Sequence, residues 1–482
     1  MRKAGVLMPV ASLPSDYGIG DFGPKSYQFA ELIHRCGFSI WQILPLNPLG
    51  FGNSPYQPYS SHAMDELYIS LDLLAEEGMI DPAEKFHEDE NRIEYDEVRA
   101  YKQYYLREAY KQFHGSREFD RFCKEDWVYP YAVFLTLKKA HHLMCWNEWD
   151  RPSREWIRDG RLDLTPYADD IRYEMFIQYV LRKQWLQLRK HCNRLGIRIM
   201  GDVPFYVGLD SDDTWCHQEQ FLLDRDGRPQ FVAGVPPDNF SATGQRWGNP
   251  VYDWKAMRKD GFRLWTERLV YSATLYDLVR IDHFRAFDTY WKIPASCPTA
   301  MEGQWIEAPG YEFFDQLYAK HPQIRIVAED LGDLRSEVHD LRDHYHLTGM
   351  KIVQEALGNL DFSASRRNII VYTGTHDNQT IRSWYQHLPA AKKKKIRIFL
   401  AEQGCRSRSI SRNMVQYTLN SRADYAVIPL FDLLNKDDRC RINTPGTVGS
   451  PNWEWRLVSC RNLKKRAEEI RGLIRESGRL PR

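Results

Sequence analysis

A charged pair follows an apolar segment in the chain, where Tyr276-Asp277-Leu278-Val279 leads into Arg280-Ile281-Asp282. Side chains alternate along a strand, so Arg280 and Asp282 face one way and Ile281 faces the other. A neighbouring guanidinium favours the ionised form of a carboxyl group, and an ionised carboxylate can act as a nucleophile or stabilise positive charge. The alternative interpretation is a structural ion pair at the end of a strand.

Two further acids come at the ends of apolar segments. Glu329 follows Ile326-Val327-Ala328, and an apolar setting raises the pKa of a carboxyl group so that it can donate a proton. Asp377 lies between His376 and Asn378. A nucleophilic carboxylate about 5–5.5 Å from a protonated carboxyl group can cleave a glycosidic bond with retention of configuration. A third acid can stabilise the positive charge that develops on the sugar.

Each of these groups also has an alternative interpretation. Glu329 and Asp330 could cap the following helix, where acids near the N-terminus are common. His283, His376 and Asp377 could bind a metal ion, as in phosphohydrolases. The chain has neither H-x-x-x-H spacing nor clustered aspartates, so we expect no metal site.

Eight short apolar segments are predicted to position these acids. Each is nearly continuously apolar, which is typical of strands buried on both faces, and amphipathic helices fall between most of them. The strands are predicted at 4–8, 39–44, 197–203, 278–282, 324–329, 349–354, 369–373 and 424–429. Eight strands with intervening helices indicate an α/β fold, the (β/α)8 TIM barrel. A doubly wound open sheet is the alternative, and periodicity does not separate the two.

The placement of polar residues favours the barrel. Four of the apolar segments are followed by acids, in Met200-Gly201-Asp202, Arg280-Ile281-Asp282, Ala328-Glu329-Asp330 and Thr375-His376-Asp377-Asn378. Barrel enzymes carry catalytic groups at the carboxyl ends of their strands, so acids from four strands can converge on one mouth. Solitary buried acids at four strand ends would otherwise be costly.

We expect residues 1–482 to form a single catalytic barrel domain with two insertions. Residues 85–190 repeat apolar side chains at helical spacing and predict a helical insertion subdomain. Residues 231–254 are rich in glycine, proline and aromatic residues, including Phe240, and predict a lid or binding loop. The tail after Arg461 predicts a helix that docks on the body through one apolar stripe, made of Leu463, Ala467, Ile470 and Ile474.

Composition excludes several classes of function. The net charge of +1 gives no field that would attract nucleic acid or an anionic membrane. No segment reaches the roughly 18 apolar residues of a membrane span. The nine cysteines form no C-x-x-C motif and no regular framework, which indicates reduced thiols in a cytoplasmic protein. Thr373-Gly374-Thr375 is too short for a phosphate loop, and we expect no cofactor.

The motifs of this chain resemble those of one family. Those that contain the acids are similar to the catalytic regions of the α-amylase superfamily: Arg280-Ile281-Asp282-His283-Phe284-Arg285, Ala328-Glu329-Asp330-Leu331-Gly332 and Thr375-His376-Asp377-Asn378. Others resemble more narrowly the amylomaltases, the 4-α-glucanotransferases (disproportionating enzymes) of glycoside hydrolase family 77: Ser54-Pro55-Tyr56, Gly201-Asp202-Val203-Pro204, Gly244-Gln245-Arg246-Trp247-Gly248-Asn249-Pro250 and Asn452-Trp453-Glu454-Trp455-Arg456. The likeness extends from about Gly5 to Arg456. Many members have a Gly-Asn-Pro segment where this chain has Met64-Asp65-Glu66-Leu67, and Ala286 stands where glycine is frequent.

The resemblance implies a role for each of eleven residues. Asp282 would be the nucleophile, Glu329 the general acid/base and Asp377 the transition-state stabiliser. Residues that would contact the glucan are Arg280, His283 and His376 at the cleavage point, and Ser54, Tyr56, Asp202, Trp247 and Asn452 along the cleft. The family has inserted subdomains in a catalytic barrel and no C-terminal β-sandwich domain.

The activity that the resemblance implies is disproportionation of maltooligosaccharides. A segment of an α-1,4-glucan, such as a starch or glycogen fragment, would pass through a covalent glycosyl-enzyme to the 4-hydroxyl of glucose or of another glucan. Transfer outruns hydrolysis only if water is kept out, and the aromatic residues of 231–254 suit that role. We expect a monomer or a homodimer.

Two rival functions remain. An amylase-like hydrolase would release reducing ends without making longer chains. A non-catalytic glucan-binding barrel would have lost at least one of the three acids, and all three are present.

Overall fold

A computed structural model describes residues 2–86, 91–237, 241–361, 363 and 366–481. Its centre is a parallel eight-stranded sheet in the order β10–β11–β12–β1–β2–β3–β6–β9. The strand bounds are β1 (Lys3–Leu7), β2 (Ile40–Gln42), β3 (Arg198–Val203), β6 (Leu278–Ile281), β9 (Ile326–Ala328), β10 (Gly349–Ile352), β11 (Ile369–Tyr372) and β12 (Tyr425–Pro429). Every predicted strand is found, so the continuous apolar runs identified them correctly.

The sheet curls so that its two edge strands meet. Val327 of β9 forms a parallel bridge with Thr348, directly before β10, and the Ala328 N–H donates to the Thr348 carbonyl at 2.8 Å. This contact turns the sheet into a barrel. The TIM barrel prediction is confirmed, and the open-sheet alternative is wrong.

Alternate residues of the barrel strands pack in different places. Met200, Leu278, Val327, Met350 and Ile370 belong to one core cluster, although their strands lie around the barrel. Their sequence neighbours on β6 and β9 instead pack against the surrounding helices, in a cluster that contains Val279, Ile281, Ile326, Ala328, Leu269, Phe313 and Leu341. Arg280 lies on the same face of β6 as Leu278, opposite to the face of Val279 and Ile281 that packs on the helices.

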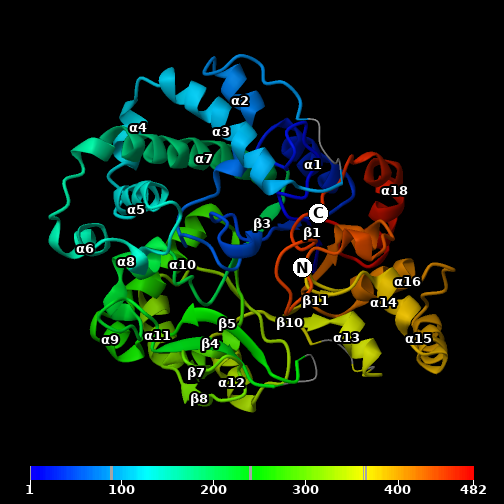
Figure 1. The fold of residues 1–482 in the computed structure, drawn as a ribbon. Coiled ribbons are helices and arrows are strands. Elements are labelled where there is room, and N and C mark those ends of the chain that lie inside the picture. The colour runs from blue at the N-terminus through cyan, green and yellow to red at the C-terminus, as the bar shows by residue number, and fades with distance from the viewer. Residues whose placement is uncertain (1, 87–90, 238–240, 362, 364–365, 482) are drawn as a thin grey trace.

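Helices cover the outside of the barrel (Figure 1). They are α1 (Pro24–Arg35), α10 (Arg263–Leu275), α11 (Gly310–Lys320), α12 (Ser336–His344), α13 (Val353–Gly358), α14 (Ile381–His387), α15 (Ala390–Glu402), α16 (Ile410–Asn420), α17 (Leu430–Leu433) and α18 (Arg461–Glu476). The predicted stripe of α18 is buried, with Leu463, Ala467, Ile470 and Ile474 at most 1% exposed. After β12 the described residues form α17 and α18 and no further strand.

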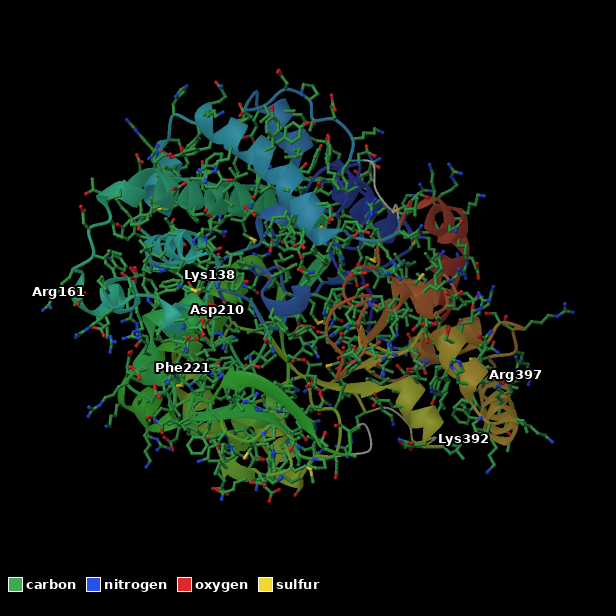
Figure 2. The ribbon with its side chains drawn as sticks, viewed as in Figure 1. Lys138, Arg161, Asp210, Phe221, Lys392 and Arg397 are labelled. Carbon is green, nitrogen blue, oxygen red and sulfur yellow. The ribbon has the colours of Figure 1, made fainter. Side chains whose placement is uncertain are left out.

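Residues 85–190 contribute helices that gather on one side of the barrel in Figure 1. They follow α2 (Leu71–Glu76) and comprise α3 (Tyr95–Lys111), α4 (Arg117–Phe122), α5 (Val128–Ala140), α6 (Arg151–Asp159) and α7 (Ala168–Arg194). The boundary expected at 190 falls inside α7, because this 27-residue helix continues without interruption to the barrel strand β3. Figure 2 shows Lys138 of α5 beside Asp210, and their ion pair of 2.5 Å ties the helices to the segment after β3.

Residues 231–254 are not an irregular loop. They contain β4 (Phe231–Val235) and β5 (Gln245–Pro250), which form an antiparallel sheet in the order β5–β4–β7–β8 with β7 (Thr289–Pro294) and β8 (Gln304–Glu307). Short helices, α8 (Asp212–Cys216) and α9 (Trp254–Lys259), flank this insertion. Glycine is required at 234, where an added Cβ would lie 2.1 Å from the Gln245 carbonyl oxygen. Phe240 lies outside the described residues.

Candidate active site

The acids picked out from the sequence lie at the carboxyl ends of the barrel strands. Asp202 is near the end of β3, Asp282 directly follows β6, and Glu329 directly follows β9. Ile281 pairs with Ala328, so the next residues, Asp282 and Glu329, leave adjacent strands at the same level. Asp377 comes from the segment after β11.

Arg280 joins two of these acids. Its Nη1 donates to both carboxylate oxygens of Asp202, at 2.7 and 2.6 Å, and its Nη2 donates to Oδ1 of Asp282 at 2.9 Å. The side chains of Arg280 and Asp202 are 4% and 0% exposed, whereas that of Asp282 is 32% exposed. A buried guanidinium thus fixes the orientation of a carboxylate that remains open to the barrel mouth.

The sequence interpretation of Asp282 needs a correction. Burial raises the pKa of Asp282 above its usual value, and the charges of Asp202 and Asp377 act in the same direction. Arg280 opposes these effects but does not cancel them. The ion pair predicted from the sequence exists, yet its effect on the pKa is smaller than that of desolvation.

Glu329 is held by two backbone N–H groups. Its Oε2 accepts from His283 N at 2.8 Å, and its Oε1 accepts from Leu331 N at 3.0 Å. Burial, and then the neighbouring charge of Asp282, raises the pKa of Glu329 to about 7. This carboxyl group can therefore donate or accept a proton near neutral pH, which is the behaviour expected from its apolar strand.

Asp377 is fixed by a segment that follows β12. Its Oδ1 accepts from Asn443 Nδ2 at 2.6 Å, and its backbone carbonyl accepts from Arg441 Nη2 at 2.6 Å. His376 Nε2 lies 3.5 Å from the same Oδ1, and the Asp377 side chain is 41% exposed. Sequence reasoning missed Arg441 and Asn443, which do not directly follow a strand and belong to no motif quoted above.

Tyr56 connects Asp377 to the Arg280 cluster. Its hydroxyl donates to Asp202 Oδ2 at 2.8 Å, while its ring stacks on His376 with centroids 5.3 Å apart and an interplanar angle of 8°. Trp453 packs on both rings, with centroid distances of 5.8 Å to Tyr56 and 6.0 Å to His376. Trp453 was part of a recognised motif but was not selected as a site residue.

Trp247 approaches the site from β5 of the antiparallel sheet. Its ring meets His283 edge to face at a centroid distance of 4.8 Å, and its backbone carbonyl accepts from Gln57 Nε2 at 2.9 Å. Burial, followed by the charge of Arg285, lowers the pKa of His283 to about 3, so its imidazole is neutral. Gln57, next to Tyr56, was also missed by sequence reasoning.

Ser54 and Asn452 make hydrogen bonds within their own loop segments. Ser54 Oγ accepts from Tyr56 N at 3.3 Å and so orients the Tyr56 segment. The Asn452 amide is buried and engaged in its own segment, where Oδ1 accepts from Thr444 N and Nδ2 donates to Thr447 Oγ1, each at 2.9 Å. The structure thus brings ten of the eleven predicted residues into one connected group and places the Asn452 amide beside it.

The arrangement suits carboxylate chemistry. One open carboxylate oriented by a guanidinium, one carboxyl group with a raised pKa and a third exposed acid surround the barrel mouth. Within the described ranges, no group of three or more His, Cys, Asp or Glu residues could hold a metal ion, and no helix is long and apolar enough to cross a membrane. His283 packs edge to face on Trp247.

The chain is similar to known proteins over nearly its whole length. A family model described as 4-alpha-glucanotransferase matches residues 8–461. The 4-alpha-glucanotransferase of Synechocystis sp. is 41% identical, with 94% of this chain and 94% of that protein covered. That of Thermus thermophilus is 38% identical, with 99% of each covered. The structure of amylomaltase from Streptococcus agalactiae in complex with acarbose matches with a TM-score of 0.94 at 33% identity and covers 100% of both chains.

Proposed function

The chain belongs to the 4-alpha-glucanotransferase family, and from this premise we propose that Asp282, Glu329 and Asp377 perform its transfer reaction at the barrel mouth. One observation carries the proposal: two carboxyl groups with different settings lie at the ends of adjacent strands. Arg280 orients Asp282 through a hydrogen bond of 2.9 Å, and the pKa of Glu329 is about 7. Likeness to an amylomaltase solved with acarbose supports α-1,4-glucans as substrates.

The first step breaks the donor glucan. Glu329 protonates the departing 4-oxygen while Asp282 attacks the anomeric carbon, and the product is a covalent glycosyl-enzyme with inverted configuration. Positive charge develops on the sugar ring during this step, and the Asp377 carboxylate stabilises it. Arg280 holds Asp282 in line for the attack.

The second step forms the new bond. Glu329, now ionised, removes the proton from the 4-hydroxyl of an acceptor glucan. That oxygen attacks the same anomeric carbon and displaces Asp282, so the second inversion restores an α-1,4 linkage. The partly exposed ring of Tyr56 lies beside this centre, supported from behind by His376, and a sugar ring can stack on its open face.

A disproportionation assay tests the proposed function. Incubating the chain with pure maltotriose should give a ladder of longer and shorter maltooligosaccharides together with glucose. Hydrolysis alone would give only maltose and glucose, and that outcome would replace the transferase with the amylase-like rival. Chromatography of the products at several times distinguishes the two, because longer chains appear only by transfer.

The position of Trp247 beside His283 predicts that its removal changes the ratio of hydrolysis to transfer. Trp247→Ala should raise hydrolysis of maltotriose relative to transfer, because loss of the indole opens the space above His283 to water. The ratio of reducing ends formed to longer chains formed measures the change.

A matched control is available on the same sheet. Trp305→Ala removes an exposed tryptophan from β8, the edge strand opposite β5, and should leave the ratio unchanged. If the ratio were the same in Trp247→Ala and the parent protein, the proposed exclusion of water by Trp247 would be wrong.

We also propose a cytoplasmic location and a monomer or homodimer. All nine cysteines are free thiols, which suits a reducing compartment.

A further inference from the structure

A second charged site lies at the opposite end of the barrel from the acids. Lys3 begins β1, Ser39 directly precedes β2, and Arg198 begins β3. A pocket of about 540 Å³, called here the basal pocket, is lined by Arg2, Lys3, Ser39, Asn193, Arg198 and Arg479 among others. Ligand pockets typically measure about 300–1,000 Å³.

Ion pairs among the described residues do not neutralise the cations of the basal pocket. Across the described ranges, none of Arg2, Lys3, Arg198 and Arg479 forms an ion pair within 4.0 Å. Asp277 also lines the pocket, but its carboxylate accepts from Arg189 Nη2 at 2.7 Å, Asn193 Nδ2 at 2.9 Å and Ile199 N at 2.8 Å. Its charge is therefore already matched by Arg189.

The four cations differ in whether their side chains donate hydrogen bonds to the protein. Arg479 is buried and donates to backbone carbonyls, including those of Lys3 and Leu419, while Arg2 donates to the Ser421 carbonyl at 2.7 Å. By contrast, the Lys3 ammonium and the Arg198 guanidinium donate to no group in the described part of the chain. Both are half-buried and line the pocket.

The cations are close enough to repel one another. Burial, with the charges of Arg198 and Arg325, lowers the pKa of Lys3. Burial and the charge of Arg2 lower the pKa of Arg479 to about 10, although the charge of Asp424 acts the other way. The chain as a whole has a net charge of only +1, so this excess of positive charge is local.

Helix ends do not account for the arrangement. A helix C-terminus attracts cations, and α7 ends nearby at Arg194. Lys3 and Arg198, however, belong to strands, whose dipoles are small. Attraction by a helix C-terminus therefore does not account for the positions of Lys3 and Arg198, the two cations whose donors are free.

We propose that the basal pocket binds a small phosphate-bearing anion. The ammonium of Lys3 and the guanidinium of Arg198 would donate to the phosphate oxygens, for which a guanidinium fork is well matched. Ser39 and Asn193 add polar groups beside them. An open surface of α7 formed by Arg189, Lys190 and Arg194 adjoins the basal pocket at Asn193 and leaves room for the remainder of a phosphorylated sugar.

Binding at this site would link distant parts of the chain. Residues 2–3, the start of β3 and Arg479 all line the basal pocket. An anion that binds only the folded chain raises its unfolding temperature in a concentration-dependent manner. The acids lie at the other ends of the same strands, so removal of the anion site should leave the transfer rate unchanged.

The test compares anions on the full-length chain. Thermal unfolding and calorimetric titration are performed with inorganic phosphate and with glucose 6-phosphate, at an ionic strength matched with sodium chloride. Both phosphates should raise the unfolding temperature and chloride should not. Tighter binding of glucose 6-phosphate would identify a phosphorylated sugar as the ligand class, and equal binding would identify phosphate itself.

Variants locate the binding. Lys3→Gln combined with Arg198→Gln should weaken phosphate binding by roughly tenfold or more, the effect of losing charge-assisted hydrogen bonds. Lys392→Gln combined with Arg397→Gln removes two cations of α15, labelled in Figure 2, and should bind as the parent does. The single variant Lys3→Gln, which breaks no described hydrogen bond, serves if the double variant does not fold. Equal phosphate affinity in the parent and the folded Lys3 variant, or an equal effect of chloride, would overturn the proposal.

Discussion

Replacing Asp282 with Asn is expected to lower the rate of glucan transfer by about 10⁴-fold or more, as loss of a nucleophile does in other enzymes. The amide has the same shape but cannot form the covalent glycosyl-enzyme. The Arg280 hydrogen bond to Oδ1, at 2.9 Å, can be kept by the amide oxygen, so the fold should be retained. Initial rates on maltotriose, with circular dichroism of the same sample, measure both effects.

The control for this variant is Asp277→Asn, just before the other end of β6. Asp277 is also paired with an arginine, Arg189, at 2.7 Å, but it lies at the end of the barrel remote from the acids. Its rate per folded molecule should stay close to that of the parent. A rate above about a tenth of the parent's in Asp282→Asn would remove this residue as the nucleophile.

Replacing Glu329 with Gln should lower transfer from maltotriose by roughly 10²–10⁴-fold, the usual contribution of a general acid. The loss should depend on the leaving group. With an α-maltosyl fluoride donor, fluoride departs without protonation, so the first step should be slowed much less. Glu174→Gln is the matched control, because Glu174 is a buried glutamate with a raised pKa that is paired with Lys139 outside the site.

The pH dependence of the parent follows from the same residue. Glu329 must be protonated to start the reaction, and its protonated fraction falls as the pH rises through its pKa of about 7. We therefore expect kcat/KM to decrease above about pH 7 and this basic limb to disappear in Glu329→Gln. On the acidic side, kcat/KM should decrease as Asp282 gains a proton, at a pH above the usual range of an aspartate because burial raises its pKa. A basic limb that persisted unchanged in Glu329→Gln would assign it to another group.

The barrel strands could be predicted because they are buried on both faces. Segments such as 197–203 and 324–329 are nearly continuously apolar, and the acids directly after them mark the mouth. The sheet formed by β4 and β5 could not be predicted in this way. β5 carries Gln245, Arg246 and Asn249 instead of a continuous apolar run, and β4 pairs with β7, more than fifty residues further along the chain.

Site residues at the ends of apolar strands could be predicted from the sequence, and those in irregular segments could not. Asp202, Asp282 and Glu329 were found because each stands at a strand end. Asn443 holds Asp377 from a segment with no regular structure, so local pattern gave no signal for it. The balance of effects on the Asp282 pKa depends on burial, which composition and spacing do not report.

The uninterrupted course of α7 has a mechanical consequence. An uninterrupted helix of 27 residues is about 40 Å long. It begins among the outlying helices and ends four residues before Arg198, on the strand that carries Asp202. One continuous helix therefore joins the outlying helices to the strand whose Asp202 binds Arg280, so any shift of those helices along the α7 axis is felt at that strand.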